Sequence, residues 1–259
     1  MNRQEQDVLA TETEGVRTIT LNRPDSLNAI NVSLLSQLVR ALHEAQDARA
    51  VVLTGTGRAF CTGEDLKQTL APQSGKPDEL RRSFELLQEV TRAITRLKAP
   101  VVAAVHGYAV GGGAEIALAA DLVVLQKGTR IRFPEVPIGH AHTGGITLRL
   151  PQIVGLMRAK ELLLRGRWIE STEAVALGLA IEETADASAR AHELAAELAG
   201  QPPRSLAAAK HAIETATFPM QEANLRMEVD AATYCFASIE ADAAFEDFKL
   251  RGNVAGARS

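Results

Sequence analysis

The sequence predicts an α/β fold followed by a helical C-terminal part. Short apolar segments of strand length alternate with longer amphipathic segments through the first part of the chain. Beyond about residue 188 the pattern is almost entirely helical, and a glycine-rich junction at residues 106–115 separates a strand-like from a helix-like segment. We therefore place a core over residues 1–195 and a helical region over 196–259, which we expect to cover a neighbouring element or subunit.

The first elements follow from local patterns. Residues 15–21 alternate as a half-buried strand does, and the turn residues that follow end it. Asn31 or Ser33 is a candidate cap for a helix, whose apolar residues recur at helical spacing. Residues 50–55 are predicted to form a buried strand that a glycine-rich turn closes.

The middle of the chain repeats this alternation. A polar stretch at about 70–78 predicts a surface loop, and residues 79–97 predict an amphipathic helix that ends before Pro100. Further elements are predicted beyond it, namely strands at 100–105, 122–125 and 130–133, a rigid corner at 134–137, a helix at 156–164, an extended segment at 166–169 and a helix from Ser171.

Composition excludes several classes of protein. The 259 residues are 46% hydrophobic, which is enough for a substantial core. The N-terminus is too polar for a signal peptide and no apolar run is long enough to span a membrane, so we expect a cytoplasmic protein. Cys61 and Cys235 lack metal-ligand spacing and predict reduced thiols and no metal site. A net charge of −4 with dispersed basic residues argues against nucleic acid as a partner.

The junction at residues 106–115 carries three consecutive glycines and Glu115. Backbone N–H groups at a helix start have no intrahelical partner, and without Cβ atoms a ligand oxygen can approach them closely. One interpretation is therefore a site that stabilises an oxyanion, with Glu115 as an acid or base. The other is a tight turn followed by an ordinary first-turn carboxylate. No nucleotide-binding glycine motif occurs in the chain.

An ordered set of motifs resembles the enoyl-CoA hydratase/isomerase (crotonase) family. The motifs are residues 21–24 with 28–29, 59–66, 100–107, 111–115, Asp121 and 133–135, and the resemblance continues through 155–178. It implies a crotonase-like spiral of β-β-α repeats with a helical C-terminal region that contributes to trimerisation and covers the active site. It also implies a homotrimer or a dimer of trimers that acts on acyl-CoA substrates, with coenzyme A present only as part of the substrate and no cofactor.

By the resemblance, two backbone N–H groups bind the thioester carbonyl. One belongs to Gly112 and the other to Glu64, which stands where hydratases more often have a small residue. Preorganised amides of this kind contribute about 2.7–4 kcal/mol per donor to the stabilisation of an oxyanion. For the Glu64 side chain we expect a solvated or ion-paired carboxylate, because most charged side chains stay exposed. The alternative is a substrate-pocket residue that alters specificity.

Two glutamates at the positions that hold water in hydratases favour a hydratase. They are Glu115 and Glu135, and the resemblance makes Glu115 the base toward water and Glu135 the acid toward the α-carbon. The sequence therefore predicts reversible addition of water to the 2,3 double bond of a 2-enoyl-CoA. The alternatives are isomerase, dehydratase or hydrolase chemistry on the same scaffold, or a non-catalytic oligomeric binding protein.

The segment after Glu135 departs from the hydratase pattern. Thr143 stands where glycine is usual, and its Cβ would narrow the site. His140 and His142 are candidate pocket residues, and their two-residue spacing would face them oppositely in a strand, which argues against chelation. His106 is expected to be packed structure.

The resemblance implies two regions that bind coenzyme A, one near the N-terminus and one in the last helix. Arg23 is the candidate for its phosphates, because the guanidinium suits phosphate geometry, and Leu27 with Ala29 would lie near the nucleotide. In the last helix of the chain, Lys249 or Arg251 could reach a nucleotide, the alternative being plain surface charge.

Overall fold

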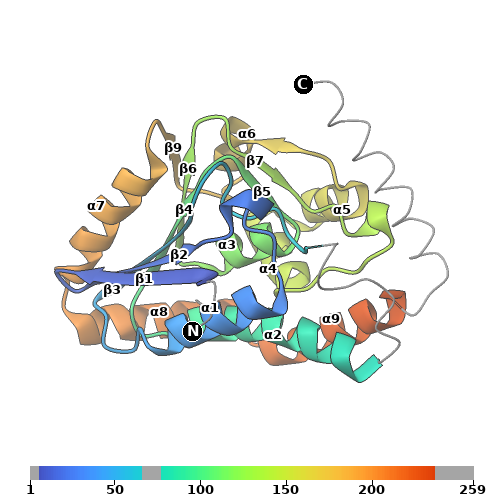
Figure 1. Cartoon of the computed structure of the whole chain (residues 1–259), viewed down its shortest axis with the longest axis horizontal. Coiled ribbons are helices and arrows are strands. Elements are labelled where there is room, and N and C mark those ends of the chain that lie inside the picture. The colour runs from blue at the N-terminus through green and yellow to red at the C-terminus, as the bar shows by residue number, and fades with distance from the viewer. Residues whose placement is uncertain (1–5, 66–76, 237–259) are drawn as a thin grey trace, which may run out of the picture.

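The computed structural model describes residues 6–65 and 77–236, which form two sheets surrounded by helices (Figure 1). The larger sheet has the order β1-β2-β3-β4-β6-β9, and all of its neighbouring strands are parallel except the β1–β2 pair. Its strands are β1 (Val8–Thr13), β2 (Val16–Leu21), β3 (Ala50–Gly55), β4 (Val101–Val105), β6 (Leu122–Gln126) and β9 (Glu182–Thr184). The smaller sheet has the order β5-β7-β8, formed by Tyr108–Val110, Arg130–Arg132 and Ile169–Glu170.

The chain passes repeatedly from the larger sheet to the smaller one and then into a helix. Strand β4 lies in the larger sheet, β5 in the smaller one, and α3 follows; then β6, β7 and α4 repeat the same path. After β3, Cys61 bridges Ala109 of β5, so that segment also reaches the smaller sheet before α2 begins. This recurrence is the β-β-α spiral that the resemblance implied. The segments that follow the carboxyl ends of β3 and β4 therefore lie close together, in a region formed by loops and helix N-termini.

Helices cover both faces of the larger sheet. Along one face lies α7, whose Ala187, Ala191 and Ala195 pack against the valines and alanines of β2, β3, β4 and β6 (Figure 1). The helices are α1 (Val32–His43), α2 (Pro77–Arg96), α3 (Gly112–Ala119), α4 (Ile146–Val154), α5 (Leu156–Arg165), α6 (Ser171–Ala176), α7 (Ala187–Ala199), α8 (Pro203–Thr217) and α9 (Gln221–Phe236), with 3-10 turns at Pro24–Ser26 and Val136–Ile138. None of the helices within the described ranges is both long and apolar enough to cross a bilayer.

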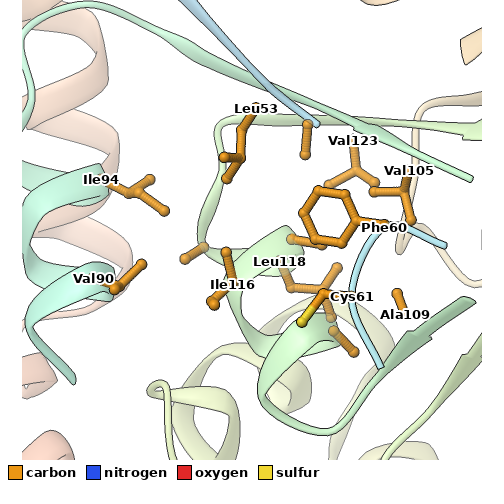
Figure 2. Packing of buried hydrophobic residues seen from close by; sticks show 14 of the residues in the cluster. Leu53, Phe60, Cys61, Val90, Ile94, Val105, Ala109, Ile116, Leu118 and Val123 are labelled. Atoms are coloured by element: carbon orange, nitrogen blue, oxygen red, sulfur yellow. The ribbon is translucent and has the colours of Figure 1, made fainter. Parts of the chain in front are cut away.

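Helix α3 lies inside the main core. Figure 2 shows Ile116 and Leu118 of this helix between Val90 and Ile94 of α2 on one side and Phe60, Val105 and Val123 on the other. Every residue from Gly113 to Ala119 is buried. Because a helix of eight residues is only marginally stable by itself, this packing is what holds α3 and its carboxylate in place.

Most predicted elements are confirmed, and the differences have local causes. Asn31 caps α1, since its side chain accepts a hydrogen bond from the N–H of Leu34 at 2.8 Å. The extended segment predicted at 166–169 follows α5, which runs to Arg165 and ends where Gly166 adopts φ +56°, and Ile169 begins β8. Strands β1, β5 and β9 and helix α4 were not predicted; all four are only three to nine residues long.

Two other predictions concern boundaries. Most of the predicted loop at 70–78 lies outside the described residues, and Pro77 already begins α2. The boundary proposed at residue 195 falls inside α7, whose alanines belong to the sheet packing. The packing of the described residues therefore continues across that position.

Candidate active site

A largely apolar cavity lies where the segment after β3, the start of α3 and the corner after β7 meet. Its walls include Glu64, Gly112 and Glu135 from these three segments. Helix α2 contributes Phe84 and Leu87 to the cavity, and its remaining lining residues are Ile30, Leu35, Thr62, Gly63, Ser83, Val110, Gly111, Pro134, Ile138, His140, Ala141, Thr143 and Phe236. The spiral path of the chain thus brings together residues that are far apart in sequence.

The glycines at the start of α3 are required by the close packing of this wall. Gly111 adopts φ +51°, and a Cβ there would lie 2.6 Å from Oε1 of Glu135. A Cβ on Gly113 would lie 2.4 Å from the carbonyl oxygen of Cys61. Gly112 is the first residue of α3, so its N–H has no intrahelical acceptor. This amide is the first of the two that the sequence analysis singled out.

The second amide belongs to Glu64. Its neighbours form a parallel bridge with Ile30: the N–H of Ile30 donates to the carbonyl of Gly63 at 2.7 Å, and the N–H of Asp65 donates to the carbonyl of Ile30 at 2.8 Å. In such a bridge the N–H of the central residue points away from the partner strand. Within the described part of the chain, the N–H groups of Glu64 and Gly112 donate to no other group, and both residues line the cavity.

The Glu64 side chain is not the solvated or ion-paired carboxylate that we expected. Its Oε1 is enclosed and has no hydrogen-bond partner among the described residues. Burial, and then the nearby Glu135 and Asp65, raise the pKa of this carboxyl well above its usual range. The neighbouring Asp65 is the ion-paired residue of this segment, since it lies 2.9 Å from Arg23. The expectation failed because adjacent residues of an extended segment point to opposite sides.

Glu115 is held by the loop that carries Thr143. The backbone N–H of Thr143 donates to Oε1 of Glu115 at 3.0 Å, and its hydroxyl donates to Oε2 at 2.7 Å. The carboxyl is almost fully buried, at 1% exposure. Burial and the charge of Glu135 raise the pKa of Glu115 to about 8, although the hydrogen bond from Thr143 acts in the opposite direction. Burial thus favours the protonated form of this carboxyl in the unliganded protein.

Glu135 faces His142 instead. Nδ1 of His142 lies 2.9 Å from Oε2 of Glu135, and both side chains are buried. Burial alone would lower the pKa of the imidazole, but Glu135 beside it and Glu115 outweigh burial, so the pKa of His142 is raised. The other ring nitrogen lies 3.3 Å from the carbonyl oxygen of Leu163.

The three side chains form one compact cluster. One oxygen of Glu115, one oxygen of Glu135 and one nitrogen of His142 all lie within 4.8 Å of one another. A water at about 2.8 Å from each of two oxygens can bridge such a separation. By spacing alone the same trio could ligate a metal ion. Its groups, however, already have protein partners in Thr143 and in the Glu135–His142 pair, and the expectation of no metal stays a prediction.

His140 and Thr143 line the cavity, whereas His142 lies behind Glu135. The imidazole of His140 packs on Phe236, with ring centroids 4.2 Å apart, and burial lowers its pKa to about 4. His106 is half-buried, and its Nε2 lies 3.2 Å from the carbonyl oxygen of Gly57, outside this cavity.

The sequence analysis missed Glu228 of α9. This buried carboxylate accepts hydrogen bonds from the N–H groups of Gly145 and Thr147 at 2.7 and 3.0 Å, and another from the Thr147 hydroxyl at 2.6 Å. It thereby fixes the loop whose Thr143 holds Glu115. A signal was present in the sequence, because Glu228 lies at helical spacing among the buried Leu225, Val229 and Ala232.

The candidate residues for coenzyme A have different environments. The Arg23 guanidinium binds Asp65 and the carbonyl oxygen of Ala29 and lies 3.8 Å from Asp7, with the side chain only 10% exposed. It is therefore engaged in holding its own turn, which gives no support to a phosphate-binding role. Leu27 is half-buried with φ +53°. Lys249 and Arg251 lie outside the described residues.

Comparison with known proteins identifies the family. The sequence model described as enoyl-CoA hydratase/isomerase matches residues 11–253. The chain is 31% identical to a short-chain-enoyl-CoA hydratase of Clostridium acetobutylicum, with 95% of each chain covered. It is 32% identical to a 1,2-epoxyphenylacetyl-CoA isomerase of Escherichia coli, with 86% of this chain and 87% of the relative covered.

Solved structures agree with this result. An enoyl-CoA hydratase/isomerase from Mycobacterium paratuberculosis superimposes with a TM-score of 0.89 at 30% identity, covering 95% of this chain and all of that one. The fold is thus that of the crotonase-type enzymes. The chain belongs to the enoyl-CoA hydratase/isomerase family, and hydratases and isomerases occur among its relatives at similar identity.

Proposed function

We propose that this enzyme is an enoyl-CoA hydratase, which reversibly adds water to the 2,3 double bond of a 2-enoyl-CoA and forms a 3-hydroxyacyl-CoA. The observation that carries the proposal is the pair of buried carboxyls, Glu115 and Glu135, within 4.8 Å of each other beside the cavity. Hydration requires one group that takes a proton from water and one that gives a proton to the α-carbon. Two carboxyls with different neighbours supply both.

The thioester carbonyl would accept hydrogen bonds from the N–H groups of Glu64 and Gly112. Addition at the β-carbon moves charge onto this oxygen, and amides that have no other acceptor stabilise it without reorganisation. Both amides belong to the cavity walls and donate to no other described group. The rest of the wall is mainly apolar, which strengthens these interactions by excluding water.

The pair of carboxyls must share one proton. In the unliganded protein the raised pKa of Glu115 and the imidazole beside Glu135 favour the proton on Glu115. Family resemblance makes Glu115 the base and Glu135 the acid, which requires the proton on Glu135 when the substrate reacts. The water held between the two carboxyls provides the path for that transfer. The proposal involves no metal and no cofactor other than the coenzyme A of the substrate.

The test measures loss of enoyl-thioester absorbance with crotonyl-CoA and with longer 2-enoyl-CoA substrates. We expect Glu115→Gln and Glu135→Gln each to lower kcat by about 10²–10⁴-fold, the usual contribution of a proton-transfer group. Glu197→Gln, at an exposed position of α7, is the matched control and keeps the wild-type rate. Absence of hydration with every chain length would refute the hydratase, and wild-type activity in both active-site variants would refute the two-carboxyl mechanism.

An isomerase is the second candidate, because a relative from Mycosarcoma maydis that is 35% identical is named as an enoyl-CoA isomerase/hydratase. Moving a double bond from the 3,4 to the 2,3 position needs proton transfer at two carbons but no added water. A 3-enoyl-CoA offered to the enzyme would then gain absorbance as the conjugated product forms, while 2-enoyl-CoA would remain unhydrated. That pair of results would replace the hydratase by the isomerase.

We also propose a cytoplasmic homotrimer or dimer of trimers. Large apolar side chains lie exposed on α8 and α9 and on the turn between them, namely Ile213, Met220, Met227 and Tyr234. Such side chains are typical of surfaces that subunit contacts cover. Sedimentation equilibrium at micromolar concentration tests this, and a monomeric mass would refute it.

A further inference from the structure

Glu64 and Asp65 are adjacent carboxylic acids with opposite surroundings. Asp65 lies 2.9 Å from Arg23, so its charge is neutralised inside the protein. The Glu64 side chain, in contrast, lines the cavity with one oxygen enclosed and without a hydrogen-bond partner in the described residues. A buried polar atom without a partner costs free energy, and such atoms are rare in folded proteins. An unpaired oxygen in a cavity wall therefore indicates a group that a ligand completes.

The position of Glu64 specifies which part of a ligand it meets. Its backbone N–H is one of the two proposed donors to the thioester oxygen, and its carboxyl is close enough to Glu135 for their charges to interact. Glu135 faces the reacting carbons in the proposed mechanism. The Glu64 side chain consequently extends beside the acyl group rather than beside the coenzyme.

The neighbours of Glu64 decide the charge of the group it binds. The walls of the cavity that Glu64 lines also include the apolar side chains of Phe84, Leu87 and Phe236. Burial and nearby carboxylates raise the pKa of Glu64 well above its usual range, which favours the uncharged carboxyl, and this form carries an O–H donor. An anionic acyl group would be repelled by the carboxylate of the catalytic pair, and an ammonium group would lose much of its hydration among the apolar walls.

We propose that Glu64 is a specificity-determining residue that donates a hydrogen bond to an uncharged oxygen, a carbonyl or hydroxyl, on the acyl group of the thioester substrate. The enzyme would thus prefer oxygen-bearing acyl groups to plain alkyl groups of equal length. This inference rests on the proposed function only in that the cavity receives an acyl-CoA.

Binding of unreactive ligands tests the inference apart from catalysis. Saturated thioesters cannot be hydrated, so calorimetry can compare pentanoyl-CoA with 4-oxopentanoyl-CoA and hexanoyl-CoA with 5-oxohexanoyl-CoA. We expect the wild-type enzyme to bind one of the oxo compounds about tenfold more tightly than its alkyl counterpart, which is the effect of about one buried hydrogen bond.

Two variants of similar size form the matched pair. Glu64→Gln keeps an N–H donor and should retain the preference within about threefold, whereas Glu64→Leu removes every polar atom of the side chain and should abolish it. Both variants keep the backbone N–H, so the comparison isolates the side chain. Equal unfolding temperatures of Gln and Leu variants exclude a general loss of structure.

Each outcome separates the two proposals. Equal affinities for oxo and alkyl ligands in the wild type, or an unchanged preference in Glu64→Leu, overturn the role of Glu64 and leave the hydratase intact. A preference for the oxo ligand without hydration of any 2-enoyl-CoA overturns the hydratase and supports Glu64. Failure to bind any of the four thioesters overturns both, and tighter binding of 5-aminopentanoyl-CoA than of 4-oxopentanoyl-CoA overturns the choice of an uncharged oxygen.

Discussion

The two carboxyls of the candidate active site are the same residue type, are both buried and lie in one cluster, yet their partners differ. Glu115 receives an N–H and a hydroxyl hydrogen bond from Thr143, both of them uncharged donors. Glu135 has an imidazole nitrogen at 2.9 Å, which is a cation when protonated. An uncharged donor stabilises a carboxylate less than a cation does.

This difference favours the protonated form of Glu115 in the unliganded protein. Burial raises the pKa of Glu115 to about 8, and the Thr143 hydrogen bonds are too weak to reverse that effect. The Glu135–His142 pair in turn raises the pKa of the imidazole despite burial. The two glutamates thus differ chiefly in one neighbour each, Thr143 beside Glu115 and His142 beside Glu135. Replacing either neighbour should change the pH dependence of the hydration rate.

Among changes to the neighbours of the two carboxyls, the largest expected effect comes from His142→Asn. Without the imidazolium, the carboxylate of the pair loses its nearby cation and takes up a second proton more readily. We expect the acidic limb of the pH profile of kcat/KM to move up by about one pH unit, which lowers the rate at pH 6 by about tenfold. The measurement is the hydration rate between pH 5 and pH 10.

The control for this variant is His140→Asn. Burial lowers the pKa of His140 to about 4, so this imidazole is uncharged at neutral pH. Its replacement can alter KM, because His140 lines the cavity, but it should leave the acidic limb in place. Equal shifts in both variants would show that the charge of His142 is not the cause.

Thr143→Val should produce a smaller change, in the alkaline limb of the pH profile of kcat/KM. The hydroxyl donates to Oε2 of Glu115 at 2.7 Å and so stabilises the ionised form. Removing it raises the pKa of Glu115 further, and the alkaline limb, where the pair loses its shared proton, should move up by about half a pH unit to one unit. Thr143→Ser keeps the hydroxyl and should keep the wild-type limb. A shift to lower pH in the valine variant would contradict this account.

The sequence alone predicts much of the site because several of its residues act through local structure. Gly112 is recognisable as a helix start, and Glu115 follows it by less than one turn. Glu135 stands next to Pro134 in a corner that the sequence also predicts. The resemblance adds the order of these motifs along the chain, which periodicity does not supply.

The remaining features depend on contacts between distant segments. Glu228 reaches the loop at Gly145 across 83 residues of sequence, and the pairing of His142 with Glu135 depends on the turn that their loop adopts. The enclosed oxygen of Glu64 results from which side of the segment faces the cavity. Side-chain direction in an irregular segment is set by tertiary packing, so no sequence pattern predicted these three features.

The smallest expected effect concerns stability and again separates the two carboxyls. The pKa of Glu115 is raised on folding, so the unfolded chain releases this proton at lower pH than the folded protein does. Folding stability should therefore fall as pH rises from about 4.5 to about 8. Glu115→Gln cannot ionise, and its amide can donate to the Thr143 hydroxyl.

We expect the unfolding temperature of Glu115→Gln to equal that of the wild type at pH 4.5 and to exceed it by a growing margin as the pH rises to 8, because only the wild-type side chain must keep a proton in the folded protein. The readout is circular dichroism at one protein concentration, so that assembly contributes equally to both proteins. Glu197→Gln, at its exposed site, should show no growing difference with pH. A difference that shrinks toward pH 8 would mean that Glu115 is ionised in the folded protein, and the proton would then have to be assigned to the Glu135 side of the pair.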